Sequence, residues 1–251
     1  MKTAFITGLG RSGTKFLTAL LSECAGTDCR HEFTGNREFW ILSWYQQPDI
    51  YTLPYLEREK KRIESSAKAQ LFIDVNGYLH HCTPQLKATF SPVAIFHLVR
   101  DPKYVIRSLY SRRIEKDIHI VPKSKPEVER WLDEDKFYRI CWNWKEATEK
   151  LLNEGWPVIR FESILNDYSY LTENILNPLG ISLSQSQWEQ KISLKINRTR
   201  PAYYRKLYSI IKGKPYIEEK IPPYNEWTAR QKEIFKELCQ ELMIRCGYPQ
   251  A

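Results

Sequence analysis

The sequence predicts an α/β fold in which one parallel sheet is covered by helices on both faces. Short apolar runs typical of buried strands occur at residues 3–7, 71–75, 93–99 and 158–161. Helical segments lie between them, and strands that alternate with helices are typical of a parallel sheet. The 251 residues contain no repeat and no composition typical of a linker, so we expect a single domain over residues 1–251.

Helices are expected wherever apolar residues recur at helical spacing between those runs. The first follows the first strand over residues 15–24. The others are expected at residues 56–70, 84–90, 103–113, 124–152 with room for a break, 176–181, and from Thr228, where Thr228 and Gln231 form a capping box, to Gly247. The aromatic-rich residues 39–55 are either the core of a helical layer or the wall of a ligand site.

The composition suits a protein that binds an anion. Lys and Arg number 38 against 30 Asp and Glu, a formal net charge of +8. A nucleic-acid-binding protein would need a continuous basic face, whereas the cations at residues 57–68 and 127–150 are interspersed with glutamates. We therefore expect a small anionic ligand and no nucleic acid.

Three further classes of protein are disfavoured by the pattern of residues. The 6 cysteines contain no C-x-x-C pair and the histidines are scattered, so we expect neither a metal site nor a redox motif. No apolar run is long enough to span a membrane. The first strand begins almost at Met1, which leaves no room for a signal peptide, and we expect a cytoplasmic protein.

The turn after the first strand carries the strongest functional signal, Gly8-Leu9-Gly10-Arg11-Ser12-Gly13-Thr14. A strand, a glycine turn and a helix N-terminus in succession form an anion cradle, because unpaired N–H groups and the helix dipole converge there. Nucleoside triphosphatases have a lysine directly after the last glycine and a hydroxyl residue after it. Here Thr14 precedes Lys15, and Phe16 stands where the hydroxyl that holds magnesium would be. The loop therefore indicates a phosphate or sulfate ligand without magnesium.

The segment Arg11-Ser12-Gly13-Thr14 resembles the 5′-phosphosulfate loop of the sulfotransferase family, which binds 3′-phosphoadenosine 5′-phosphosulfate (PAPS) without a metal. Arg100 and Ser108 match the spacing of the family's 3′-phosphate motif, an arginine at a strand end and a serine on the following helix. A guanidinium can donate two hydrogen bonds to such a phosphate. Val158-Ile159-Arg160-Phe161-Glu162 resembles the family's V-R-Y-E-D strand, and Cys246-Gly247-Tyr248 its L-G-Y ending.

The resemblance implies a single-domain, P-loop NTPase-like sulfotransferase fold. It also implies transfer of a sulfuryl group from PAPS to a hydroxyl or amine, leaving adenosine 3′,5′-bisphosphate (PAP). Lys15 replaces the family's second threonine, and its ammonium either stabilises charge on the leaving phosphate or points to solvent. By this resemblance the 5′-phosphosulfate is surrounded by Gly10, Arg11, Ser12, Gly13, Thr14, Lys15 and Phe16, with Arg11 and Lys15 catalytic, and a basic loop with Arg198 and Arg200 closes over the nucleotide.

Glu32 is the first candidate for the general base that takes the acceptor's proton. It ends an expected strand, and His31-Glu32 resembles the position where tyrosylprotein and many bacterial sulfotransferases place a catalytic glutamate. The alternative is that Glu32 only pairs with a neighbouring arginine. Asp74, at the end of a strand, and the pair His80-His81 are competing candidates for the base.

A kinase that uses Mg-ATP is the main rival function, because Leu71-Phe72-Ile73-Asp74 also resembles a Walker B strand. The acceptor of a sulfotransferase would be a small molecule or a saccharide. Aromatic residues at 33–55 and 203–224 can line a site for a lipid, a polyketide, a phenol or a sugar equally well. Neither the acceptor nor the oligomeric state follows from the sequence.

Overall fold

The computed structural model describes residues 1–45, 48–111, 120–194, 207, 210–211, 213 and 220–250. Within them a five-stranded sheet has the order β2-β3-β1-β4-β5, and every neighbouring pair is parallel. The predicted α/β class is confirmed. The strands are β1 (Lys2–Thr7), β2 (Thr27–His31), β3 (Leu71–Asn76), β4 (Val93–Val99) and β5 (Val158–Arg160).

The central strand β1 shows why the sheet must be covered on both faces. Ala4 and Ile6 belong to one apolar cluster and Phe5 to another, and all three are fully buried. Because successive side chains of a strand point to opposite faces, both faces of β1 are apolar. The helices that follow each strand supply the two covering layers.

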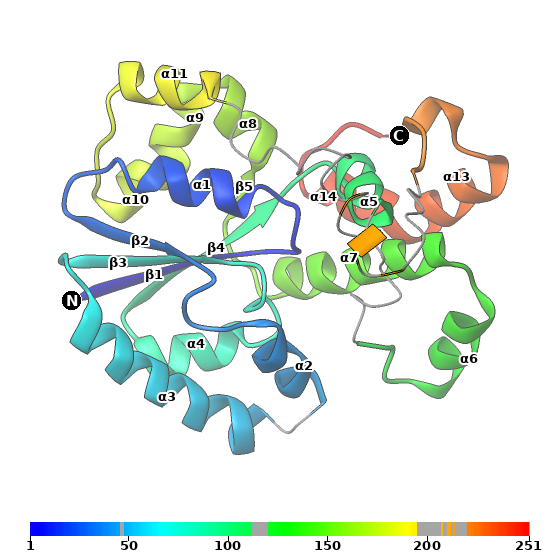
Figure 1. The fold of residues 1–251 in the computed structure, drawn as a ribbon, viewed down its shortest axis with the longest axis horizontal. Helices are drawn as coiled ribbons and strands as arrows, with labels where there is room; N and C mark the ends of the chain where they lie inside the picture. The colour runs from blue at the N-terminus through cyan, green and yellow to red at the C-terminus, as the bar shows by residue number, and fades with distance from the viewer. Residues whose placement is uncertain are drawn as a thin grey trace.

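The helices form three groups around the sheet (Figure 1). One face carries α1 (Thr14–Leu21), α8 (Phe161–Asn166), α9 (Tyr168–Leu171), α10 (Asn177–Leu179) and α11 (Gln185–Ser193), with the π-helical turn η2 (Thr172–Leu176) between α9 and α10. The other face carries α3 (Pro48–Ser66) and α4 (Thr83–Phe90).

The third group lies beside the carboxyl ends of the strands; most of it is on the right in Figure 1, with α2 below the middle of the view. Its apolar cluster includes the tryptophans of α2 (Arg37–Tyr45) and the buried face of α7 (Lys136–Asn153). The remaining members of this group are α5 (Pro102–Tyr110), α6 (Lys125–Asp133), η3 (Tyr224–Glu226), α13 (Ala229–Phe235), η4 (Lys236–Gln240) and α14 (Glu241–Arg245).

Several element boundaries differ from those expected. The helix α1 ends at Leu21, and Thr27 and Asp28 belong to β2 because they pair with Leu71 and Phe72 of β3. The described residues of the aromatic-rich stretch are helical, in α2 up to Tyr45 and in α3 from Pro48, earlier than predicted. The expected break in residues 124–152 is confirmed between α6 and α7, where Asp135 caps α7 by accepting a hydrogen bond from the Tyr138 N–H at 3.0 Å.

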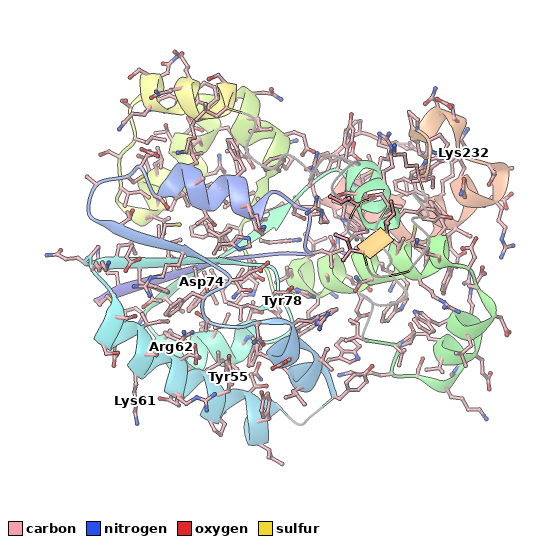
Figure 2. The ribbon with its side chains drawn as sticks, in the orientation of Figure 1. Tyr55, Lys61, Arg62, Asp74, Tyr78 and Lys232 are labelled. Atoms are coloured by element: carbon pink, nitrogen blue, oxygen red, sulfur yellow. The ribbon has the colours of Figure 1, made fainter. Side chains whose placement is uncertain are left out.

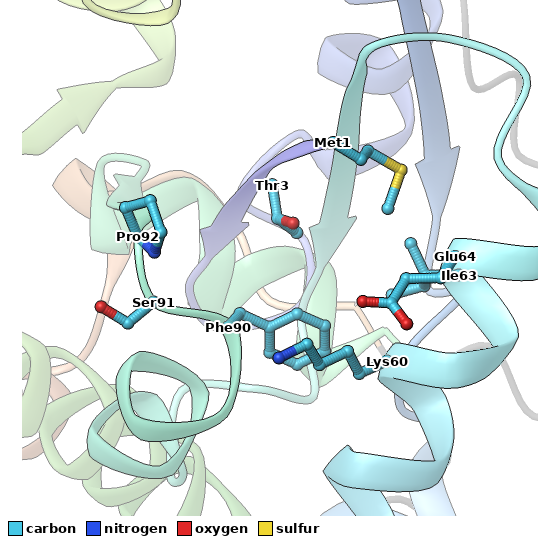
Figure 3. Close-up of a pocket in the computed structure, with 8 residues that line it drawn as sticks. All are labelled: Met1, Thr3, Lys60, Ile63, Glu64, Phe90, Ser91 and Pro92. Carbon is cyan, nitrogen blue, oxygen red and sulfur yellow. The ribbon is translucent and has the colours of Figure 1, made fainter.

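A pocket at the amino ends of the strands is far from the loop that the sequence singles out. Figure 3 shows it between α3 and the starts of β1 and β4, where Met1, Thr3, Lys60, Glu64 and Pro92 line it. The glycine turn after β1 is at the opposite edge of the sheet, because β1 runs from Lys2 to Thr7.

In the part of the chain described here, no helix is both long and apolar enough to cross a membrane.

Candidate active site

The turn between β1 and α1 has a backbone that only a few residue types adopt without strain. Gly13 has φ 98° and lies directly before the first residue of α1, and Arg11 has φ 80° although it is not glycine. A non-glycine residue in this left-handed region costs free energy, and such residues are enriched at binding sites. The turn therefore has the strained backbone that is typical of a ligand-binding loop.

Two glycines of this turn are required by close neighbours. A Cβ at Gly8 would lie 2.1 Å from the carbonyl oxygen of Leu98, and a Cβ at Gly13 would lie 2.2 Å from the Phe161 ring. The turn consequently passes directly against β4 and the start of α8. No acidic residue lies in the first turn of α1, so its positive end is open to an anion.

Arg11 connects the turn to the two residues predicted to bind a 3′-phosphate. Its Nε donates a hydrogen bond to Ser108 Oγ at 2.8 Å, and its carbonyl oxygen accepts one from Arg100 Nη1 at 3.3 Å. Arg100 follows β4, and Ser108 lies on α5, whose N-terminus is capped by Asp101. The structure thus brings Arg11, Arg100 and Ser108 together from segments about ninety residues apart.

Glu32 is the residue directly after β2, and its position is fixed through the backbone. Its N–H donates to the Val75 carbonyl at 3.2 Å, which continues the β2–β3 ladder by one residue. Its φ of 51° then turns the chain away from the sheet. The side chain is 33% exposed and lies at the same carboxyl edge of the sheet as the glycine turn. Glu32 is therefore accessible to a ligand bound there.

Asp74 holds the turn that carries Glu32. Its carboxylate is fully buried and accepts hydrogen bonds from the N–H groups of Phe33 at 3.1 Å and Thr34 at 2.7 Å. Asn76 Nδ2 donates to the same carboxylate at 3.1 Å and to the Gly35 carbonyl at 2.9 Å. Figure 2 shows Asp74 among the strands at the centre of the molecule. Burial raises the pKa of Asp74, and the hydrogen bonds oppose that shift. Both carboxylate oxygens are used inside the protein.

Replacing Asp74 by asparagine is expected to lower the free energy of unfolding by about 1–3 kcal/mol, because the amide keeps one oxygen as an acceptor and turns its N–H₂ toward an N–H donor that then has no acceptor. Chemical denaturation of Asp74→Asn beside wild type measures this loss. Asp133→Asn is the control, because Asp133 is an exposed carboxylate on α6. Equal stability of the two variants would show that Asp74 does not hold this turn.

His31 links the glycine turn to Glu32. Its Nε2 lies 3.0 Å from Thr14 Oγ1 at the first residue of α1, and its Nδ1 lies 3.6 Å from Glu32 Oε2. Burial and, to a smaller extent, the charge of Lys15 lower the pKa of His31. The imidazole is therefore neutral at pH 7 and can donate or accept one hydrogen bond on each side.

Lys15 is exposed at the start of α1. Its positive charge disfavours a second positive charge on His31, which is one cause of the lowered pKa of that imidazole. Ser12 and Thr14 are buried, and Ser12 N–H donates to the Leu9 carbonyl at 3.3 Å. Phe16 is buried against Phe161, with ring centroids 5.8 Å apart, so it packs in the core below the turn.

The two adjacent histidines belong to an aromatic cluster. His80 is 1% exposed, and its Nδ1 lies 2.9 Å from the Gly77 carbonyl, so this nitrogen carries the proton. Burial lowers its pKa to about 4. The His81 ring stacks on Trp40 at 5.9 Å and packs against Trp44 at 4.6 Å. Trp40 and Trp44 are themselves buried, which supports the core interpretation of these aromatics.

Two of the residues expected at the site, Arg198 and Arg200, lie outside the described residues. The structure also brings residues to the site that the sequence did not predict there. The structure adds His31 beside Glu32, and it adds a contact between Tyr248 and Glu162 next to Arg100. The sequence signalled the second contact only through two motifs far apart in the chain. Among the described residues no cluster of three or more His, Cys, Asp or Glu side chains is arranged to hold a metal ion.

Neither a family model nor a curated protein matches this chain. Solved structures do match it over most of its length. The sulfotransferase domain of the Synechococcus PCC 7002 olefin synthase is 15% identical, with 94% of each chain covered and a TM-score of 0.55. The sulfotransferase domain of the curacin biosynthetic pathway is 13% identical, with 100% of this chain and 99% of that chain covered and a TM-score of 0.57.

A mouse sulfotransferase in complex with PAP is also similar. It is 15% identical, with 96% of this chain and 84% of that chain covered and a TM-score of 0.53. At such low identity the likeness concerns the arrangement of the elements rather than individual side chains. The expected fold is confirmed: the chain has the α/β fold of the sulfotransferases.

Proposed function

We propose that residues 1–251 form one sulfotransferase domain that transfers the sulfuryl group of PAPS to a hydroxyl or amine. The observation that carries the proposal is the junction of Arg11 with Arg100 and Ser108. It joins the loop expected to bind the 5′-phosphosulfate to the two residues expected to bind the 3′-phosphate. These are the two anionic groups of PAPS, and each receives its own set of donors.

In this proposal PAPS, the sulfuryl donor, lies along the carboxyl edge of the sheet. The residues from Gly10 to Phe16 and the dipole of α1 bind the 5′-phosphosulfate, through backbone N–H groups other than that of Ser12, which donates to the Leu9 carbonyl. Arg11 and Lys15 neutralise charge as it develops on the leaving phosphate. Arg198 and Arg200 would close over the nucleotide. Within the Arg11 junction, Ser108 Oγ accepts the Arg11 hydrogen bond, so its own hydroxyl proton can be donated to a phosphate oxygen.

The reaction proceeds as an in-line displacement at sulfur. The acceptor oxygen forms a bond to sulfur while the bond from sulfur to the phosphate oxygen breaks, and PAP leaves. Glu32 accepts the proton of the acceptor hydroxyl, which makes the attacking oxygen more nucleophilic. Its accessible position at the edge of the sheet and its contact with His31 beside the glycine turn support this role.

A kinase function has less support from this site than a sulfotransferase function. A Walker B aspartate needs a carboxylate directed at the magnesium ion or its water ligands, whereas both oxygens of Asp74 accept hydrogen bonds from buried N–H donors. The aromatic ring of Phe16 lies at the loop position where a kinase has a metal-binding hydroxyl, and the ring is buried.

A small-molecule or saccharide acceptor and a cytoplasmic location are parts of the proposal that rest on the sequence alone.

Calorimetric titration with PAP, run beside ATP with magnesium, tests the proposed donor site. We expect PAP to bind without a metal, with a Kd of about 1 μM or lower, which corresponds to about 8 kcal/mol of binding free energy. Addition of EDTA should leave the affinity unchanged. Binding of Mg-ATP in the absence of PAP binding would contradict the proposal and support the kinase function.

A further inference from the structure

We propose that Tyr248 and Glu162 are positioning residues for Arg100, and that they set the preference of this protein for a nucleotide with a 3′-phosphate. The inference rests on the proposed function, because it takes Arg100 to bind that phosphate. It concerns the C-terminal turn after α14. The proposed contacts with PAPS do not include residues of this turn.

Glu162 and Tyr248 contact the backbone on both sides of Arg100. Glu162 Oε1 accepts a hydrogen bond from the Asp101 N–H at 3.2 Å, and Tyr248 Oη lies 3.4 Å from the Val99 carbonyl oxygen. Tyr248 Oη donates its proton to Glu162 Oε2 at 2.6 Å. Residues 99 to 101 are therefore held between one side chain from α8 and one from the end of the chain.

The same carboxylate lies close to the guanidinium of Arg100. The distance from Glu162 Oε1 to Arg100 Nε is 3.8 Å, longer than a hydrogen bond. The guanidinium carbon also lies 5.3 Å from the centroid of Phe161 and 5.6 Å from that of Tyr104. The Glu162 carboxylate thus orients Arg100 without a direct hydrogen bond. Nη1 donates to the Arg11 carbonyl, and the other N–H groups of the guanidinium are left for an anion.

The Tyr248 hydroxyl is what keeps Glu162 in this intermediate position. A carboxylate that has lost its hydroxyl donor gains by moving onto the neighbouring guanidinium, where it forms a direct ion pair. Such a pair would compete with a 3′-phosphate for the same N–H groups. Burial, followed by the bond to Glu162, raises the pKa of Tyr248, so the hydroxyl carries its proton throughout the physiological pH range.

The C-terminal turn is built to hold Tyr248 in this place. Gly247 has φ 81°, the Tyr248 N–H donates to the Met243 carbonyl at 3.1 Å, and the Gly247 N–H donates to the Ile244 carbonyl at 2.8 Å. These are the bonds of a helix that ends on a left-handed glycine. Arg160 Nη1 donates to the Gly247 carbonyl at 2.6 Å, which ties the turn to β5. The tyrosine is therefore positioned by its backbone as well as by its ring.

The test is calorimetric and needs no acceptor. The affinities of wild type, Tyr248→Phe and Tyr170→Phe for PAP and for adenosine 5′-monophosphate are measured, and the ratio of the two affinities reports the 3′-phosphate contribution. Tyr170 is the matched control, because its hydroxyl likewise contacts the backbone of a strand, here β5, where it accepts from the Arg160 N–H at 2.9 Å. We expect Tyr248→Phe to lower the ratio by about fivefold, the equivalent of one net hydrogen bond, and Tyr170→Phe to leave it unchanged.

The double variant Glu162→Gln with Tyr248→Phe tests whether the tyrosine acts through the carboxylate. In the Glu162→Gln background no negative charge competes for Arg100, so adding Tyr248→Phe is expected to change the ratio by less than about twofold. An undiminished effect in that background would overturn the inference. A Tyr248→Phe variant with the same affinity ratio as wild type would also overturn it, and so would a variant that binds both nucleotides more weakly by the same factor. If wild type itself fails to prefer PAP, it is the assignment of Arg100 to the 3′-phosphate that fails.

Discussion

Replacing Glu32 by glutamine is expected to lower kcat for sulfuryl transfer by about 10²- to 10⁴-fold, the range of a lost general base. Glutamine has nearly the same shape as glutamate but cannot take a proton at neutral pH. The backbone contact of Glu32 with Val75 and the turn held by Asp74 do not involve the side chain that is changed. The fold and PAP affinity should therefore be preserved.

The measurement is the release of PAP from PAPS with an acceptor chosen from a panel of phenols, sugars and lipid alcohols. Glu38→Gln is the matched control, because Glu38 is an exposed carboxylate on the neighbouring helix α2. We expect it to keep full turnover. A Glu32→Gln variant that turns over at the wild-type rate and binds PAP normally would exclude Glu32 as the base. Both carboxylate oxygens of Asp74 are engaged in hydrogen bonds inside the protein. His80 and His81 would then be the remaining candidates for the general base among those that the sequence suggested.

The parts of the site that could be predicted from the sequence are those made by short stretches of chain. The glycine turn is one, because its strand, glycines and helix follow one another within residues 1–21. The spacing of Arg100 and Ser108 is another, because a strand end and a point on the next helix have a fixed geometry. Local order of this kind depends on propensity and periodicity, which a sequence displays directly.

The contacts that could not be predicted join residues far apart in the chain. The turn at Glu32 depends on Asp74, which lies about forty residues later and whose role follows from the pairing of β2 with β3. The contact of Tyr248 with Glu162 spans 86 residues. The start of α3 was not predicted for a different reason: Pro54 lies inside the helix and lowers the helical propensity of that stretch, and tertiary packing of residues such as Leu56 outweighs it.

Replacing Arg100 by alanine is expected to weaken PAP binding by about 10- to 100-fold, because a charge-assisted hydrogen bond contributes about 1.5–3 kcal/mol. Affinity for adenosine 5′-monophosphate should fall much less, since this nucleotide lacks the phosphate that Arg100 is proposed to bind. Calorimetry with the two nucleotides measures both effects on one protein sample. Arg139→Ala is the control, because the Arg139 guanidinium donates to the Trp131 and Leu132 carbonyls outside the proposed site.

Arg100 also donates to the Arg11 carbonyl, so its loss could disturb the glycine turn as well as the 3′-phosphate site. The two effects are separable. A disturbed turn weakens the binding of both nucleotides, because both carry a 5′-phosphate. A lost 3′-phosphate contact weakens the binding of PAP alone. Arg100→Lys refines the comparison: it keeps the charge and loses the planar fork of donors. We expect its PAP affinity to lie between those of wild type and Arg100→Ala. Unchanged PAP affinity in Arg100→Ala would remove the 3′-phosphate assignment, and with it the observation on which the proposed function depends.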